Sequence, residues 1–461
     1  MKILKENEEN RKGKKNRKSK VNKKILESMR IIEEEKKKIK IEKRNIRNKK
    51  NDKIRKFFIS KILRMDVDKD IYSSKEIVTL FVSSFLVGIF TCIVVITILT
   101  GGRNYFKLSR DLGKFFDVYE TLTHNYYDSI DKEKLVDDAI DGMVSSVGDV
   151  YTSYVDTDSS DEFNELVSGT YEGIGCTIQM QEVGLKVIEV FDDSPAKKGG
   201  LKEEDIILKV DDLEVSEENN ADVLSNYIKN EARESITMII SRGEEEKTLI
   251  LKRGKVETPV VSSITYDRNN KKIGYISISL FSSVADKQFE KELKKLEKEN
   301  IDGLVIDVRD NNGGYLTAVT DIVNLLLSKG KVIYQVEKDG KREVTKDKTD
   351  TSRKYPIVVL TNQNSASASE ILAAAVKESY DKGYVVGTRT YGKGTVQQVK
   401  TLDDGSMIKY TVENWLTPDG NWINEKGIEP TDEVLLDNKY WEEPKVENDN
   451  QLQKALDLVS K

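Results

Sequence analysis

The chain has 461 residues, a length typical of two or three folded units. It contains one histidine and two cysteines, too few for a zinc site of Cys and His ligands. Because the single histidine lies in a segment with a helical pattern, we expect no cysteine protease with an imidazole base. Residues 1–70 carry 27 Lys and Arg against 12 Asp and Glu, whereas the rest of the chain carries 48 against 68. A basic segment of net charge +15 therefore precedes an acidic body of net charge −20.

The basic segment, residues 1–75, is dense in charge and poor in apolar residues, which predicts a disordered or helical tail. Such segments also bind nucleic acids or membrane surfaces. Next to the apolar run that follows, its simpler role is to keep the N-terminus in the cytoplasm, and we expect no nucleic-acid partner.

Ile77–Leu99 is a run of 23 residues without a charge, long enough to cross a hydrocarbon layer of about 30 Å. Cleaved signal peptides have shorter apolar stretches close to the N-terminus. We therefore expect a retained transmembrane helix over residues 76–100, in a single-pass protein of the cell membrane whose acidic body is extracellular. A buried core helix is the alternative.

Residues 104–167 repeat apolar side chains at spacings of three and four, which predicts helices. The repeat comprises Leu112, Phe115, Phe116, Tyr119 and Leu122, and then Leu135, Ala139 and Met143. We expect a purely structural segment, and His124 falls within it.

Residues 168–254 change to short strands and turns. In order, the pieces are the turn Gly173-Ile174-Gly175, the strand patterns CTIQM and LKVIEV, the turn SPAKKGGL, the strand DIILKV, a helix over Ala221–Lys229 and a strand over Ser235–Ser241. This order resembles a PDZ domain. The resemblance implies that the glycine turn binds the terminal carboxylate of a peptide, which adds as a strand to the sheet. The alternative is that Gly173 and Gly175 only form a turn.

Residues 255–437 alternate strands and helices, which predicts an α/β core rich in βαβ units, with reactive groups on the turns after the strands. The expected strands are Ile273–Ser279, Leu304–Val308, Ile357–Leu360 and Tyr384–Val386, and the expected helices are Asp286–Glu299, Leu316–Leu327 and the stretch from the Ser/Ala run to Tyr380. Leu304–Val308 is apolar except for Asp307, as in strands buried on both faces. A helical tail, residues 438–461, follows.

The Ser/Ala run SASASE, residues 365–370, is the first candidate site. A serine nucleophile here needs a base other than the single histidine, which lies far away in a predicted helix. A lysine can serve where burial lowers its pKa from about 10.4 towards neutrality, so Ser with Lys is the natural pair. Ser367 and Glu370 also have the spacing of a capping box, which predicts a helix N-terminus whose positive pole suits an oxyanion.

Lys393 lies between glycines in the second candidate motif, YGKGTVQ. Lys393, Thr395 and Gln397 lie on one face if the chain is extended, so Gln397 can hold the lysine amine. The neighbouring Tyr391 favours burial, whereas a solvated lysine is the alternative. The preceding residues complete the GxxxxGK of a phosphate-binding loop, but Gly394 replaces its magnesium-binding hydroxyl and TVQQV is a strand pattern, so nucleotide binding is disfavoured.

Together these motifs resemble the carboxyl-terminal processing peptidases, a tail-specific family of Ser/Lys proteases, over residues 115–432. The motifs are DVRDNNGG at 307–314, SASASEI at 365–371, YGKGTVQ at 391–397, TPDG at 417–420 and GIEPTD at 427–432. The resemblance implies a βαβ-rich, crotonase-like protease core with an inserted PDZ domain, an N-terminal helical segment and one transmembrane helix. The chain departs from the family pattern at Tyr391, at Thr431, and at Gly148-Asp149-Val150-Tyr151, where a proline-containing turn is common.

The resemblance also implies the roles of the site residues. Ser367 is then the nucleophile, Lys393 the general base and Gln397 the residue that orients it. The choice of Ser367 over the two serines beside it depends on the resemblance alone. The remaining implied residues are the oxyanion donors Ala368, Gly313 and Gly314.

The implied function is that of a membrane-anchored serine endopeptidase that cleaves proteins near the C-terminus. Its partners are protein substrates with apolar C-termini, which the PDZ domain captures, and no cofactor or metal is expected. The sequence leaves the oligomeric state open, a homo-oligomer included. The alternative is a non-catalytic, membrane-tethered PDZ scaffold with a protease-like fold, against which the intact Ser, Lys and Gln set argues.

Overall fold

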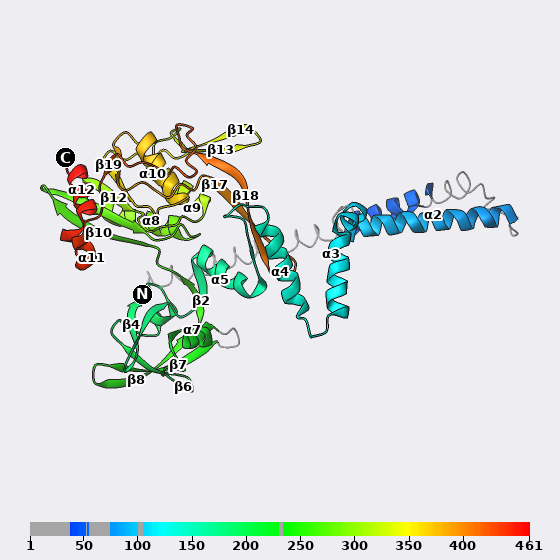
Figure 1. Cartoon of the computed structure of the whole chain (residues 1–461), viewed down its shortest axis with the longest axis horizontal. Coiled ribbons are helices and arrows are strands. Elements are labelled where there is room, and N and C mark those ends of the chain that lie inside the picture. The colour runs from blue at the N-terminus through cyan, green and yellow to red at the C-terminus, as the bar shows by residue number, and fades with distance from the viewer. Residues whose placement is uncertain (1–36, 52, 55–73, 100–104, 230–233) are drawn as a thin grey trace, which may run out of the picture. The chain divides into compact units, whose positions relative to one another are not determined.

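The computed structural model describes residues 37–51, 53–54, 74–99, 105–229 and 234–461 (Figure 1). It divides into two units, Met1–Ile130 and Asp131–Lys461. Residues 37–51 of the basic tail are helical. Residues 1–36 and 55–73 lie outside the described part, so the expectation that they are disordered or helical stays a prediction.

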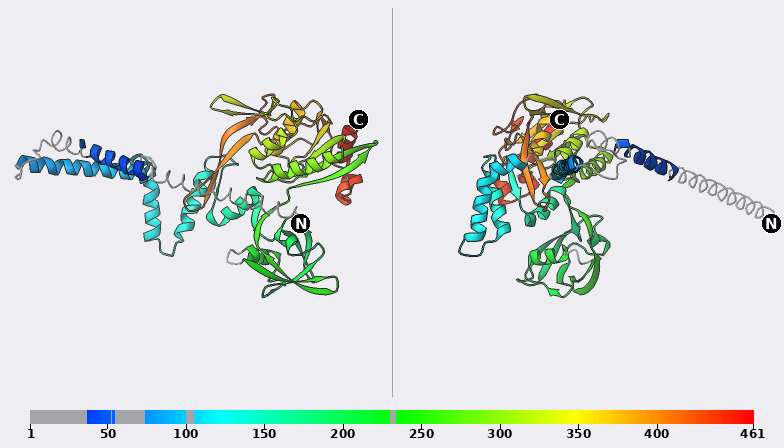
Figure 2. Two further views of the ribbon diagram at one scale, coloured as in Figure 1. Left: turned by 180° about the vertical axis from the view of Figure 1, so that it is seen from behind. Right: turned by 90° about the vertical axis from the view of Figure 1, so that its right-hand side faces the viewer.

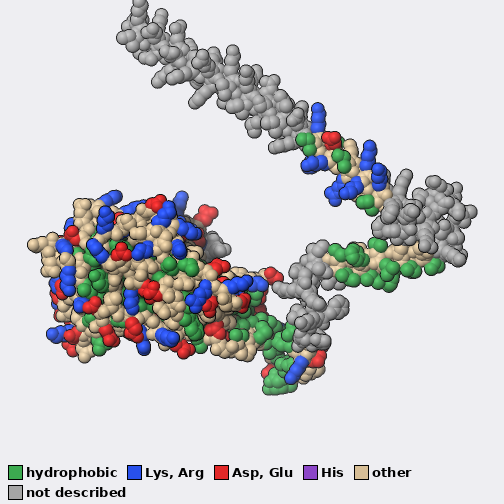
Figure 3. Space-filling view, turned by 90° about the horizontal axis from the view of Figure 1, so that it is seen from above, with side chains coloured by type: hydrophobic (Ala, Val, Ile, Leu, Met, Phe, Trp, Pro, Cys, Tyr) green, Lys and Arg blue, Asp and Glu red, His purple; other side chains and the backbone are tan. Residues whose placement is uncertain are grey.

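The first unit contains the helices α2 (Ser74–Leu99) and α3 (Tyr105–Asn125). In α2 the window Val78–Val95 has a mean hydropathy of 2.5, and none of it is buried within the described residues. Figure 3 shows the described side chains of α2 as a largely apolar surface. By length and composition, α2 is the one helix of the described chain that is able to span a membrane.

The second unit begins with the helices α4 (Lys132–Ser145) and α5 (Thr157–Ser168), separated by the short strand β1 (Ser153–Val155). Asp131 and Asp156 start the two helices, because their side chains accept hydrogen bonds from backbone N–H groups of the first turn. The helices were expected, but β1 was not, since three residues are too short to show a strand period.

A β-rich module follows, in the region that resembles a PDZ domain. Its elements are β3 (Cys176–Gln181), β4 (Gly184–Val190), α6 (Pro195–Lys198), β5 (Ile206–Val210), β6 (Leu213–Glu214), α7 (Ala221–Lys229), β7 (Ser235–Arg242) and β8 (Glu245–Lys252). The sheet has the order β3-β4-β5-β7-β8, with β6 beside β5, and encloses its own apolar cluster. The chain enters and leaves this module through one antiparallel ribbon of β2 (Thr170–Gly173) and β9 (Gly254–Glu257).

The core that follows is built on a six-stranded sheet, and its strand order is β10-β11-β12-β15-β16-β19. The strands are β10 (Val261–Arg268), β11 (Lys271–Ile278), β12 (Gly303–Asp307), β15 (Ile357–Thr361), β16 (Gly383–Gly387) and β19 (Asp432–Glu433). All pairs are parallel except β10 with β11. Every residue of β12 and β15 is buried, as the apolar runs Leu304–Ile306 and Ile357–Leu360 within them predict.

Helices cover both faces of this sheet (Figure 1). They are α8 (Ala285–Lys298), α9 (Leu316–Asn324) and α10 (Ala368–Ser379) against one face, and α12 (Asn450–Val459) against the other. The short elements α11 (Asn438–Glu442) and Val446–Asn448 precede α12. The C-terminal segment is thus part of the core, because Leu452, Leu456 and Val459 pack on the sheet.

A second, five-stranded sheet adjoins the core. It contains β13 (Val332–Lys338), β14 (Lys341–Lys346), β17 (Thr395–Thr401) and β18 (Met407–Leu416), together with β1 on the edge of β18. Figure 2 shows β17 and β18 as a long orange ribbon. Because β17 stands where a phosphate-binding loop would open a helix, the nucleotide-binding alternative is wrong.

Candidate active site

The three serines of the Ser/Ala run have different surroundings. Ser365 and Ser369 are 0% exposed. The Ser365 hydroxyl donates to the Val308 carbonyl at 2.8 Å, and the Ser369 hydroxyl donates to the Asn311 carbonyl at 2.8 Å. Ser367 is only half-buried. Of these three hydroxyls, that of Ser367 is therefore the one within reach of a substrate.

Ser367 occupies the N-cap position of α10 in a strained backbone conformation, with φ +56° and ψ −112°. Such a conformation costs of the order of 1–3 kcal/mol and is typical of functional sites. A Cβ on Gly313 would lie 2.8 Å from Ser367 Cβ and 3.1 Å from the Ala368 nitrogen, so only glycine lets the two turns approach this closely. Among the described residues no acceptor binds the Ala368 N–H.

The glycine turn is organised by Asn311, which is fully buried. Its side-chain nitrogen donates to the Ile278 carbonyl at 2.8 Å, and its oxygen accepts from the Gly313 N–H at 2.8 Å. The Gly313 N–H is therefore occupied. The Gly314 N–H has no acceptor within the described part of the chain, so it is the free donor of this turn.

Glu370 joins the serine turn to the lysine loop. It is 0% exposed and accepts four hydrogen bonds. The donors are the N–H groups of Ser367 (2.7 Å), Gly392 (2.7 Å) and Lys393 (2.9 Å) and the hydroxyl of Thr390 (2.6 Å). Burial raises the pKa of Glu370, although the four donors counteract this. One carboxylate thus fixes the backbone beside both Ser367 and Lys393.

The lysine loop is also held from its other side. The Trp415 indole N–H donates to the Lys393 carbonyl at 2.6 Å, and the Gly394 N–H donates to Asn424 at 3.1 Å. A Cβ on Gly394 would lie 2.8 Å from the Asn424 nitrogen, so the close packing of this loop requires glycine. The backbone at Lys393 is therefore rigidly placed.

The Lys393 side chain is half-buried, and its Nζ lies 4.7 Å from the centroid of the Tyr151 ring. Burial, and to a lesser extent the positive charge of Lys409, lower the pKa of Lys393 to about 8, although Asp149 and Glu370 oppose the shift. No carboxylate lies within ion-pair distance of Nζ in the described part of the chain. A substantial fraction of the amine is therefore neutral near pH 8.

Gln397 stands opposite Thr411 in the β17–β18 ladder. Its side-chain nitrogen donates to the hydroxyl oxygens of Thr395 at 2.8 Å and Thr411 at 3.2 Å. Thr411 in turn donates to Asp149 at 2.5 Å. Gln397 is thus connected to the turn after α4, a segment in which we expected no chemistry.

That turn is the part of the site that local sequence patterns did not predict. Because β1, which follows this turn, pairs with β18, Tyr151 lies against the Lys393 side chain and Asp149 contacts Thr411 of β18. The full role of Glu370 was missed as well, although its capping-box spacing from Ser367 was a signal. The strand pairing that brings Asp149 to Thr411 has no counterpart in the local pattern.

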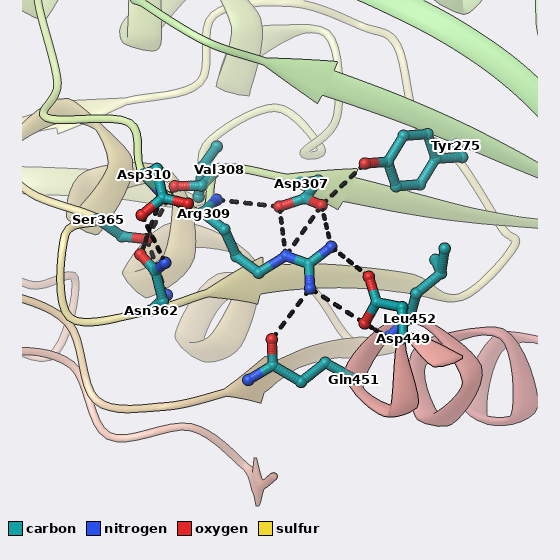
Figure 4. Close-up of polar contacts among 10 residues, drawn as sticks. All are labelled: Tyr275, Asp307, Val308, Arg309, Asp310, Asn362, Ser365, Asp449, Gln451 and Leu452. Carbon is teal, nitrogen blue, oxygen red and sulfur yellow. Dashed lines mark hydrogen bonds and ion pairs between the residues drawn. The ribbon is translucent and has the colours of Figure 1, made fainter. Parts of the chain in front are cut away.

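A buried charged cluster supports the turn in front of Ser365 (Figure 4). Arg309 lies 2.6 Å from Asp307 and 2.8 Å from Asp449, the residue that caps α12. The Tyr275 hydroxyl donates to Asp307 at 2.8 Å. Both carboxylates raise the pKa of Arg309 despite its burial. The cluster connects the end of β12 to the C-terminal helix.

In the PDZ-like module, the Gly173-Ile174-Gly175 turn precedes β3, the edge strand of its sheet. The carbonyls of Ile174 and Gly175 accept from the Ala196 and Phe191 N–H groups. Gly175 has φ +82°, a conformation that favours glycine. One side of β3 is unpaired within the described chain, as strand addition by a peptide requires.

Comparisons with protein families match three parts of the chain. Residues 272–434 match peptidase family S41, and residues 173–252 match the PDZ domain. Residues 98–159, which include α4 and the turn with Asp149, match the N-terminal domain of the activating protease CtpB.

Two curated relatives match the chain in sequence. The carboxy-terminal processing protease CtpB of Bacillus subtilis is 38% identical over 326 residues, which cover 69% of this chain and 67% of the relative. CtpA of the same organism is 36% identical, with coverage of 72% and 69%. Among solved structures, the photosystem II D1 C-terminal processing protease is similar at 24% identity with a TM-score of 0.43, covering 78% of this chain and 92% of that one.

Proposed function

Because the chain belongs to the carboxy-terminal processing proteases of peptidase family S41, we propose that it is a serine endopeptidase with a Ser367/Lys393 dyad. The observation that carries the proposal is the Glu370 carboxylate, which holds the backbone of both residues. Ser367 has the accessible hydroxyl, and Lys393 has the amine whose pKa is lowered to about 8.

In the proposed reaction, Lys393 takes the proton from the Ser367 hydroxyl while the serine oxygen attacks the carbonyl carbon of the scissile peptide. The Ala368 and Gly314 N–H groups bind the oxyanion, since both lack an acceptor in the described chain. The Lys393 ammonium then gives its proton to the leaving amine. In the second step Lys393 takes a proton from the water that attacks the acyl-serine and gives it to the Ser367 oxygen as the acyl group leaves. Gln397 orients the Lys393 amine in both steps.

The PDZ domain supplies substrate selection in this proposal. The N–H side of the Gly173–Gly175 turn binds the substrate carboxylate, Ile174 contacts an apolar C-terminal side chain, and the substrate adds to the edge of β3. Proteins with apolar C-termini are the substrate class. The helix α2 anchors the enzyme in the cell membrane, with the basic N-terminus in the cytoplasm and the protease outside.

The dyad is tested with the full-length protein in detergent and a denatured test protein that ends in apolar residues. Ser367→Ala and Lys393→Ala should abolish cleavage. Lys400→Ala, on the exposed part of β17, is the matched control and should retain it. Continued cleavage by Ser367→Ala would refute the assignment.

The PDZ role is tested with the same test protein carrying two aspartates at its C-terminus. Its cleavage should slow while binding to Ser367→Ala weakens in parallel. An inactive wild-type protein that still binds the apolar tail would favour the scaffold alternative.

Alkaline extraction of membranes and protease accessibility in intact cells test the anchor and its orientation.

A further inference from the structure

The Gly148–Tyr151 turn reaches the candidate dyad, although it lies far from both dyad residues in the sequence. Asp149 accepts hydrogen bonds from the Thr152 hydroxyl at 2.6 Å, the Thr411 hydroxyl at 2.5 Å and the Tyr151 N–H at 3.0 Å. Burial would raise the pKa of Asp149, but these donors and the charge of Lys393 lower it overall. The carboxylate is therefore ionised and can only accept hydrogen bonds.

The ionised Asp149 determines which hydrogen bonds the Thr411 hydroxyl can make. A hydroxyl has one hydrogen, and that of Thr411 is used on Asp149. Towards Gln397 its oxygen can then only accept, so the Gln397 atom that faces it must be the amide nitrogen. A Gln397 amide turned by 180° would place two acceptors against each other.

The second amide hydrogen of Gln397 is used on Thr395. Both hydrogens of the nitrogen are thus bound, and the amide oxygen has no donor within the described part of the chain. An amide oxygen is the group that can accept a hydrogen bond from a lysine amine or ammonium.

We propose that Asp149 is a positioning residue, which fixes the Gln397 amide through the Thr411 hydroxyl and leaves the amide oxygen free for Lys393. The inference rests on the proposed Ser367/Lys393 function. It assigns the turn before β1 a part in the active site, so that pairing of β1 with β18 completes the site.

The charge of Asp149 provides a second readout. The groups that act on the Lys393 amine are Lys409 on β18, Glu370 on α10 and Asp149 on the turn, while the Tyr151 ring covers Nζ. Tyr391, in the lysine loop itself, interacts with Tyr151. Removing the negative charge of Asp149 favours the neutral amine, so the rising limb of the pH–rate profile should move to lower pH.

The test compares kcat, KM and pH–rate profiles of full-length variants on one test protein. Thr411→Val keeps the charge of Asp149 but breaks the connection, so kcat should fall roughly ten- to hundredfold, the loss expected for a misplaced catalytic group, with the inflection unchanged. Thr411→Ser should restore most of the activity. Asp149→Asn should lower kcat and also move the inflection to lower pH.

Tyr154→Phe is the control, because it removes a hydrogen bond from β1 to Asp137 and leaves Thr411 and Gln397 untouched. Its kcat should stay within about threefold of the wild type, while thermal unfolding shows that all variants are folded. Wild-type kcat in Thr411→Val, or in Asp149→Asn, would overturn the inference. Activity retained by Lys393→Ala would instead overturn the proposed function.

Discussion

Two buried carboxylates lie close to the candidate site, and the protein holds them in opposite ways. Glu370 accepts four hydrogen bonds, none of which comes from a charged side chain. Asp307 faces the guanidinium of Arg309 at 2.6 Å and accepts from the Tyr275 hydroxyl. Glu370 thus accepts hydrogen bonds from uncharged donors of the Ser367 turn and the Lys393 loop, whereas Asp307 is part of a cluster of charged side chains.

The difference indicates a division of labour. Removing Glu370 changes how the turn with Ser367 lies against the loop with Lys393, so the effect should fall mainly on activity. Removing a member of the Arg309 cluster leaves unpaired buried charges between the sheet and α12, so the effect should fall mainly on stability.

Arg309→Met provides the largest expected effect. It leaves Asp307 and Asp449 buried without their partner, and we expect a loss of about 3–5 kcal/mol in the free energy of unfolding. Urea unfolding of the purified protein measures it. Arg342→Met is the control, because that exposed pair with Glu337 should contribute less than about 1 kcal/mol. Equal losses in both variants would contradict the structural role.

Glu370→Gln tests the other carboxylate. The amide has the same shape but directs its own hydrogens at backbone N–H groups, so the two loops should separate. We expect kcat to fall by about 10²-fold, with a smaller cost in stability of about 1–3 kcal/mol. Glu378→Gln, on the same helix, removes the charge from a carboxylate that accepts from the Asp419 N–H and should leave kcat nearly unchanged. Full activity in Glu370→Gln would remove the basis of the comparison.

Much of the core could be predicted from the sequence, because several of its buried strands coincide with short apolar runs. Ile357–Leu360 and Tyr384–Val386 lie within β15 and β16. By contrast, β14 was missed, since its sequence KREVTK is mostly charged and exposed and carries no apolar alternation. Its strand conformation comes from pairing with β13.

In the candidate site, too, some contacts follow from local sequence patterns and others depend on tertiary structure. The capping-box spacing predicts that Glu370 reaches back to Ser367, a contact within one helical turn. Its bonds to Gly392 and Lys393 depend on how β15 and β16 lie side by side, which no local pattern contains. Asp149 is the extreme case, because a three-residue strand brings it to the site.

The pH dependence of cleavage tests the contrast between Glu370 and Asp307 further, because Glu370 is among the charges that act on the pKa of Lys393. Lys393 must be neutral to accept a proton, so kcat/KM should rise with pH through an inflection near 8, below the 10.5 of an ordinary lysine. Lys409→Gln removes a positive charge that disfavours the ammonium, so the inflection should move to higher pH. Lys400→Gln serves as the control with the same change of net charge. An inflection near 10 in the wild type would exclude Lys393 as the base.

Tyr275→Phe is the smallest change that separates the two carboxylates. It removes one hydrogen bond to the Asp307 carboxylate and leaves the ion pair with Arg309 in place, so unfolding should become easier by about 1.5–3 kcal/mol. Tyr266→Phe is the matched control, since its ring packs edge-on against Tyr275 and its hydroxyl has no hydrogen bond within the described chain. Both variants should keep wild-type kcat, because neither touches the Ser367 turn or the Lys393 loop. A fall in kcat for Tyr275→Phe as large as that for Glu370→Gln would mean that the Arg309 cluster also sets the geometry of the chemistry, and the division between the two carboxylates would fail.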